Sequence, residues 1–197
     1  MAELVTMPLG AYQTNCYLLY RPERQDCIVI DPGYEPETVL SQVKRLGKTI
    51  AAILLTHGHF DHVGAVRDLA AETGCPVYIH EAELSMPPQM TAGRLYYTNL
   101  YTEGDIVSLA GLTIRVYHTP GHTPGSVCLE TEGLLFTGDT LFAGSCGRTD
   151  LPGGSWPTIL ASLGRLRGFD GTLQVLPGHG ESSLLSQEAR HNPFLQG

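Results

Sequence analysis

The sequence lacks paired cysteines, basic clusters and long apolar runs, and each absence removes a class of protein. Its five cysteines are odd in number and form no C-x-x-C pair, so we expect reduced thiols rather than a disulfide framework or a cysteine zinc site. No lysine or arginine cluster is present and the net charge is −8, which argues against binding to nucleic acid or to an anionic membrane. No apolar run approaches the ~20 residues that a membrane-spanning helix needs.

The N-terminus also lacks the pattern of a signal peptide. Residues 1–4 are not a basic region followed by an apolar stretch, so we predict a cytoplasmic protein. A length of 197 residues, 42% of them hydrophobic, fits one domain over 1–197 with a sizeable core. The 23 glycines and 13 prolines fall between apolar runs, which predicts many tight turns rather than disorder.

Apolar runs and helical periodicity alternate along the chain. Strands are predicted at 4–9, 16–20, 27–30, 50–55, 76–79, 106–109, 112–117, 126–130, 134–136 and 173–176. Helices are predicted through Val39, Leu40, Val43 and Leu46, and over 62–73, 157–167 and 181–190. Residues 85–104 have weak periodicity, and we interpret them as a surface excursion able to line a cleft. Two packed sheets with helices on their outer faces would bury these runs, so the expected fold class is α/β.

Seven residues of metal-ligand type share one placement, directly after an apolar run in a glycine-containing turn. They are His57, His59, Asp61 and His62 in one segment, His122 in a T-P-G-H-T-P-G segment, Asp139 in F-T-G-D-T and His179 in L-P-G-H-G. In a layered fold, turns that follow strands gather at one edge. We therefore expect these side chains to converge.

Imidazole and carboxylate groups are ligands for zinc and related metals. His57 and His59 are two residues apart, so they point the same way from an extended segment, and Asp61 and His62 begin the next predicted helix. A single histidine after a strand is usually structural. Five histidines and two aspartates in this arrangement instead predict two metal ions that share one bridging carboxylate.

The four segments together resemble the metallo-β-lactamase superfamily. The motifs on which this resemblance rests are T-H-x-H-x-D-H from Thr56, G-H-T-P-G-S from Gly121, T-G-D-T-L-F from Thr137 and P-G-H-G from Pro177. Within that superfamily the chain looks most like the short glyoxalase II-like (hydroxyacylglutathione hydrolase-like) enzymes, with added likeness in 143–150 and 192–195. The resemblance implies a four-layer αβ/βα sandwich of two mixed sheets.

The resemblance also implies an assignment of the ligands. His57, His59 and His122 would hold one metal, Asp61, His62 and His179 the other, and Asp139 would bridge them. Zinc is the expected metal, although the same donors accept iron or manganese. Two ions ~3.5–4 Å apart can share a water and lower its pKa, so that a bridging hydroxide attacks a carbonyl carbon. Asp61 would also orient this hydroxide.

The implied reaction is hydrolysis of a thioester, such as S-lactoylglutathione, or of a related small acyl substrate. Full-length glyoxalase II enzymes carry a C-terminal helical domain that builds much of the glutathione site, and this chain ends 18 residues after His179. The alternative is a persulfide dioxygenase with one iron on His57, His122 and Asp139. The P-G-H-G segment argues against it, and β-lactamase and nuclease roles rank lower.

The roles of Asp31, Arg148 and three tyrosines stay open at this point. Asp31 follows a predicted strand and either fixes the tautomer of a ligand histidine or is a plain turn residue. Arg148 either contacts a substrate anion near the cleft or pairs with Asp150. Tyr96, Tyr97 and Tyr101 either line a substrate groove or form a partly buried aromatic patch.

Overall fold

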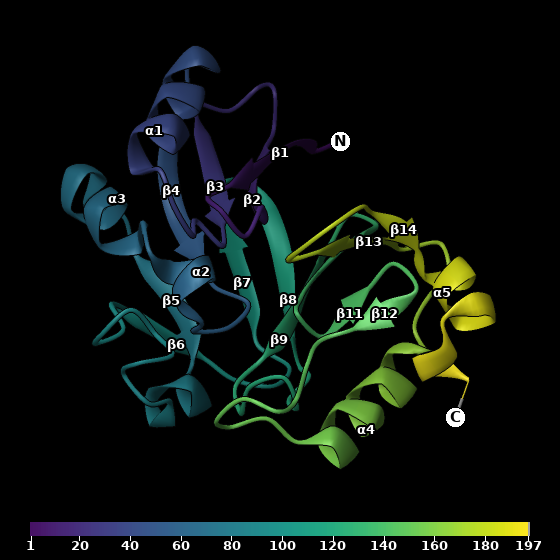
Figure 1. Cartoon of the computed structure of the whole chain (residues 1–197). Helices are drawn as coiled ribbons and strands as arrows, with labels where there is room; N and C mark the ends of the chain where they lie inside the picture. Colours follow the sequence, from purple (N-terminus) through teal and green to yellow (C-terminus); the bar gives the residue numbers. More distant parts are fainter. Residues whose placement is uncertain (197) are drawn as a thin grey trace.

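Two six-stranded sheets lie face to face in the computed structural model, which describes residues 1–196 (Figure 1). In the first sheet the strands follow chain order: β1 (Glu3–Leu9), β2 (Thr14–Tyr20), β3 (Asp26–Ile30), β4 (Thr49–Leu54), β5 (Val77–His80) and β6 (Asn99–Tyr101). Strands β1 to β3 pair antiparallel, and β3 to β6 pair parallel. The sheet is therefore mixed, as predicted.

The second sheet is also mixed. Its order is β14 (Ser183–Leu184), β13 (Gln174–Pro177), β10 (Leu134–Gly138), β9 (Val127–Thr131), β8 (Leu112–His118) and β7 (Ile106–Leu109). Only β10 and β13 pair parallel, and the other neighbours are antiparallel. A short hairpin of β11 (Leu141–Phe142) and β12 (Ser145–Cys146) follows β10.

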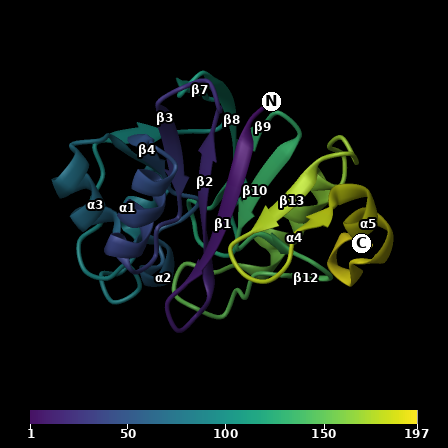
Figure 2. The same cartoon turned by 90° about the horizontal axis from the view of Figure 1, so that it is seen from above.

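Helices cover the outer face of each sheet. Helices α1 (Pro36–Arg45) and α3 (Val66–Thr73) lie on the first sheet, and α4 (Trp156–Leu166) and α5 (Leu185–His191) lie on the second (Figure 2). The short helix α2 (Phe60–Val63) and the 3₁₀ turns η1 (Glu81–Ser85) and η2 (Pro193–Leu195) complete the fold. No helix within residues 1–196 is long and apolar enough to cross a membrane.

Alternating side chains of the strands build three apolar layers. Cys27 and Val29 of β3 face the helices, whereas Ile28 and Ile30 face the opposite sheet. The second sheet follows the same rule, because Phe136 packs between the sheets and its neighbour Leu135 packs under α4 and α5. Since side chains of a strand alternate between its two faces, strands that are apolar throughout can bury both. The predicted four-layer sandwich is confirmed.

The predicted helix over 62–73 is wrong as a single element. The backbone leaves the helix between α2 and α3, where the Ala65 amide donates to the Pro32 carbonyl at 3.0 Å. Gly64 packs so closely on Gly33 that an added Cβ would lie 2.2 Å from the Gly33 carbonyl oxygen. A tertiary contact with the turn after β3 therefore replaces the helical hydrogen bond.

Two other boundaries differ from the predictions. The C-terminal helix begins at Leu185 rather than 181, because Ser183 pairs with Val175 as part of β14. The 85–104 segment is not irregular throughout, since it includes β6, whose Tyr101 is only 1% exposed. Both strands are too short for an alternating pattern to be read from the sequence.

Candidate metal centre

The seven predicted ligand residues come from four loops that follow strands and meet at one edge of the two sheets. His57 and His59 follow β4, Asp61 and His62 lie in α2, His122 lies between β8 and β9, Asp139 follows β10, and His179 follows β13. The labels of α2, β9, β11 and β13 surround this region in Figure 1. The structure therefore brings all seven together from positions up to 122 residues apart in the chain.

Three of the imidazoles form a first triad, His57, His59 and His122. Their ligand atoms lie within 4.8 Å of one another, and all three side chains are buried. His59 Nδ1 is 2.8 Å from His122 Nε2. His122 Nδ1 is 2.8 Å from the Arg148 carbonyl oxygen, which only accepts, so Nδ1 carries the proton and Nε2 keeps its lone pair for a metal.

A second triad consists of Asp61, His62 and His179, again within 4.8 Å. His179 Nε2 lies 3.2 Å from Asp61 Oδ2, and His62 Nε2 lies 3.7 Å from the same oxygen. His179 Nδ1 is 3.1 Å from the Tyr12 carbonyl oxygen. That contact leaves the opposite ring nitrogen of His179 directed at the carboxylates.

Asp139 lies between the two triads. Its Oδ2 is 3.5 Å from His122 Nε2 of the first triad and 3.6 Å from His179 Nε2 of the second. Its Oδ1 is 3.3 Å from His62 Nε2. One carboxylate thus faces imidazoles of both triads, which is the position that a bridging ligand requires.

Unsatisfied polar atoms test whether these residues fit a metal. Six buried side-chain nitrogen or oxygen atoms of the described chain have no hydrogen-bond partner, and four of them belong to the cluster: His57 Nε2, His59 Nε2, His62 Nε2 and Asp139 Oδ1. Leaving a buried polar group unpaired costs about 1–3 kcal/mol. His59 Nε2 lies opposite the Nδ1 that faces His122. Cations would satisfy the other three atoms, so the donor set fits divalent metals.

The protonation of His57, His59 and Asp139 suits the same interpretation. Burial and the neighbouring imidazoles lower the pKa of His57, and burial and His122 lower that of His59 to about 4. Burial opposes ionisation of Asp139, but the charge and hydrogen bond of His62 outweigh it and hold the Asp139 pKa below its usual value. In contrast, nearby carboxylates outweigh burial and raise the pKa of His62 and His179, so these two imidazoles would release a proton on binding a metal. Neutral imidazole and ionised carboxylate are the forms that bind metals.

Asp31 supports the cluster from behind, as one of its two predicted roles requires. Its Oδ2 lies 3.0 Å from His62 Nδ1 and also accepts the Thr56 hydroxyl at 2.5 Å, while Oδ1 accepts the Thr56 amide at 2.8 Å. Asp31, His57 and His62 also have atoms within 4.8 Å. Because both Asp31 oxygens already accept hydrogen bonds, we interpret Asp31 as an orienting group rather than a ligand.

The Arg148 side chain turns away from the cluster. Its guanidinium pairs with Asp150 through two contacts of 2.7 Å, and its side chain is 61% exposed. The ion pair that the sequence left open is therefore present, and the substrate contact stays a prediction. What reaches the site is the Arg148 backbone, through the contact of its carbonyl with His122.

Two supporting residues were missed by the sequence analysis. The Thr14 hydroxyl donates to Asp61 Oδ2 at 3.2 Å. The Glu83 carboxylate accepts the amides of Gly58 and Gly125 at 2.6 and 2.7 Å. Neither residue belongs to a ligand motif. The one available signal, a polar residue next to a buried strand or within a short turn, is too common to be specific.

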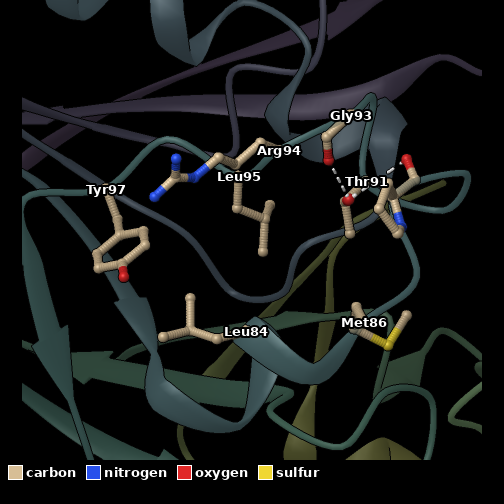
Figure 3. A pocket seen from close by; sticks show the side chains of 8 residues that line it. Leu84, Met86, Thr91, Gly93, Arg94, Leu95 and Tyr97 are labelled. Atoms are coloured by element: carbon tan, nitrogen blue, oxygen red, sulfur yellow. Dashed lines mark hydrogen bonds between the residues drawn. The ribbon is translucent and has the colours of Figure 1, made fainter.

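The 85–104 segment and η1 enclose a cavity of about 460 Å³. Figure 3 shows the side chains of Leu84, Met86, Leu95 and Tyr97 around it, together with Arg94. No residue of either triad lines this cavity. The three tyrosines do not share one patch: Tyr97 lines the cavity, Tyr96 packs on the Arg67 guanidinium, and Tyr101 is buried.

Comparisons with known proteins agree with the fold and the cluster. A family model described as the metallo-beta-lactamase superfamily matches residues 9–179. Hydroxyacylglutathione hydrolase GloC of Haemophilus influenzae is 35% identical, over 96% of this chain and 96% of that protein. The chain therefore belongs to the metallo-β-lactamase superfamily.

Two solved structures are similar over nearly their whole length. One is the crystal structure of the BLEG-1 B3 metallo-beta-lactamase, with a TM-score of 0.93, 37% identity and coverage of 99% of this chain and 100% of that chain. The other is TTHA1623 in a di-iron-bound form, with a TM-score of 0.87, 38% identity and coverage of 97% and 100%. The TTHA1623 structure thus shows a protein of this fold with iron bound.

Proposed function

We propose that this protein is a metal-dependent hydrolase that uses two divalent ions, most simply zinc. The observation that carries the proposal is the position of Asp139, whose two oxygens face imidazoles of both triads at 3.3 to 3.6 Å. The first triad would hold one ion, the second triad the other, and Asp139 both. Bound together, two divalent ions supply Lewis acidity and lower the pKa of a shared water toward neutrality.

The chain's own side chains prepare the site for this chemistry. Asp61 accepts a hydrogen bond from the Thr14 hydroxyl, which holds the carboxylate where it can orient a water molecule. Every residue of the two triads except His179, whose side chain is 28% exposed, is buried, so electrostatic interactions within the site are strong. Backbone carbonyls and Asp31 set the tautomers of His62, His122 and His179 before any ligand binds.

For the substrate we propose a small, diffusible thioester of the S-lactoylglutathione kind. The support is the 35% identity to GloC over 96% of both proteins. The test measures turnover of glutathione and coenzyme A thioesters by protein loaded with two zinc ions per chain. Hydrolysis that is lost in Asp139→Ala would support the proposal. An absence of hydrolysis across the panel, at full metal occupancy, would remove it.

A β-lactam is the second candidate substrate, favoured by the similarity to the BLEG-1 B3 metallo-beta-lactamase. Both reactions attack a carbonyl carbon, so the same metal centre serves either one. The ratio of kcat/KM for a chromogenic cephalosporin to that for S-lactoylglutathione decides between them.

The single-iron persulfide dioxygenase remains the candidate of a different reaction class. It would use His57, His122 and Asp139 and leave the second triad without a role. The convergence of Asp61, His62 and His179 within 4.8 Å favours the two-metal hydrolase. Oxygen uptake with glutathione persulfide, together with one iron per chain, would reverse this order.

A further inference from the structure

A buried carboxylate lies behind the first triad and belongs to neither triad. Glu83, in η1, has no exposed surface. Its Oε2 accepts the amide of Gly58 at 2.6 Å, and its Oε1 accepts the amide of Gly125 at 2.7 Å. These are the short distances of hydrogen bonds to an ionised acceptor.

The two amides belong to the two loops that carry the first triad. Gly58 stands between His57 and His59, and Gly125 closes the turn that begins at His122. Both oxygens of one carboxylate therefore join the backbone of the His57–His59 loop to that of the His122 loop. No comparable connection to Glu83 reaches the residues of the second triad among the hydrogen bonds of the described chain.

Glycine is required at both contact points. An added Cβ on Gly58 would lie 2.8 Å from Glu83 Oε2, and one on Gly125 would lie 2.7 Å from the Glu83 backbone nitrogen and 2.8 Å from Oε1. The glycines in H-G-H and H-T-P-G thus let the backbone approach the carboxylate. Two loop sequences and one distant glutamate form a single packing unit.

A carboxylate is a costly way to fill this position. Burial raises the pKa of Glu83, and hydrogen bonds from Thr123 and from the Gly58 and Gly125 amides pull it back only in part. Because an apolar or neutral residue would avoid the cost of burying a charge, the carboxylate has a purpose other than filling space. Groups behind metal ligands commonly serve to hold those ligands in place.

We propose that Glu83 is a positioning residue that fixes the spacing between the His57–His59 loop and the His122 loop, and so sets the metal affinity of the first triad alone. The inference rests on the two-metal centre of the proposed function. It adds that the first triad has a support of its own in Glu83, whose hydrogen bonds do not reach the second triad.

The test replaces Glu83 by glutamine, which keeps its shape but offers one oxygen to two amides. We expect one of the two zinc ions to bind about 10–100-fold more weakly, measured by competition with a chromophoric chelator. The absorption spectrum of the cobalt(II)-substituted protein should change with it. Glu188→Gln is the matched control, because Glu188 is 5% exposed and accepts the Gly144 amide at 2.8 Å outside both triads.

Two backgrounds show which ion is affected. In His179→Ala, where only the first triad is complete, Glu83→Gln should weaken the remaining ion by the same factor. In His122→Ala, where only the second triad is complete, it should change nothing. Equal zinc affinities with and without Glu83→Gln, or an effect in the His122→Ala background, would overturn the inference.

The remaining outcomes are also decisive. A Glu83→Gln chain that fails to fold, judged by circular dichroism, while Glu188→Gln folds, would overturn the inference, because Glu83 would then support the whole fold. Wild-type protein that binds no second ion would instead overturn the proposed function, and the inference with it. Since these assays measure binding and not turnover, a wrong substrate leaves the inference intact.

Discussion

His62 Nδ1 lies 3.0 Å from Asp31 Oδ2, and the two side chains are 0% and 2% exposed. Asp31 also accepts the amide and the hydroxyl of Thr56, so its carboxylate is held from two sides. A carboxylate can only accept, so it keeps the proton of His62 on Nδ1. His62 Nε2, which lies 3.3 Å from Asp139 Oδ1, is therefore the nitrogen that is left for a metal ion.

Asp31→Asn should therefore weaken the metal ion of the second triad. The asparagine amide would meet the His62 N–H as a second donor and favour the other tautomer, in which Nε2 is protonated and cannot bind a metal. We expect a loss of about 10–100-fold in affinity for one ion, measured by chelator competition. The backbone is preserved, because asparagine tolerates the left-handed conformation of this position, where φ is 50°.

The comparison for this change is Thr56→Val, which removes the hydroxyl that Asp31 accepts and that lies 3.2 Å from His57 Nδ1. It should cost less metal affinity than Asp31→Asn, since His62 would keep its acceptor. If Asp31→Asn binds two ions as tightly as wild type, Asp31 has no orienting role and is a turn residue.

The strands could be predicted from the sequence where both faces are buried. In β3 and β4 almost every side chain is apolar and enters one of two cores, so the run itself marks the strand. The two-residue strands β11, β12 and β14 contain too little pattern. The break between α2 and α3 depends on the contact of Gly64 with Gly33, which a local pattern does not encode.

The candidate site likewise contains residues that could be predicted from the sequence and residues that could not. The seven ligand residues could be predicted from their side-chain types and from their positions directly after strands, and in the structure all seven lie in one cluster. The residues that hold these ligands in place could not be predicted, because Thr14, Tyr12 and Glu83 act through contacts with segments 25 to 167 residues away. Two of these contacts use backbone atoms, whose direction no side-chain motif specifies.

Gly178→Ala should disrupt the metal centre while the sheets stay intact. An added Cβ would lie 2.2 Å from Asp139 Oδ1 and 2.6 Å from His62 Cε1, so it would push apart two proposed ligands. We expect fewer than two zinc ions per chain by elemental analysis. Gly180→Ala is the matched control in the same loop: its φ of +79° costs about 1–2 kcal/mol, but no atom lies within 4 Å. Equal metal content in both variants would contradict the prediction.

The thiols should be nearly unreactive in the folded protein. Four of the five cysteines are buried, and only Cys146 is half-exposed. Burial raises the pKa of Cys27 and of Cys128 to about 12, so almost no thiolate exists at pH 8, and the slow reaction of these two thiols should speed up about tenfold for each pH unit below their pKa. Ellman's reagent should modify at most one thiol quickly in the native protein and all five in guanidinium. Two or more fast native thiols would show that the core opens readily.

Gly164→Ala should stabilise the protein without touching the metal centre. Gly164 lies inside α4 on its exposed face, and an added Cβ would meet nothing within 4 Å. Alanine restricts the unfolded chain and favours the helix, which is worth about 0.5–1 kcal/mol. For a domain of this size the gain corresponds to a rise in Tm of roughly 1–4 °C, measured by calorimetry at fixed metal occupancy. Because the added Cβ contacts no residue of the metal centre, the zinc affinities should match those of wild type. A lower Tm would mean that α4 needs glycine at this position.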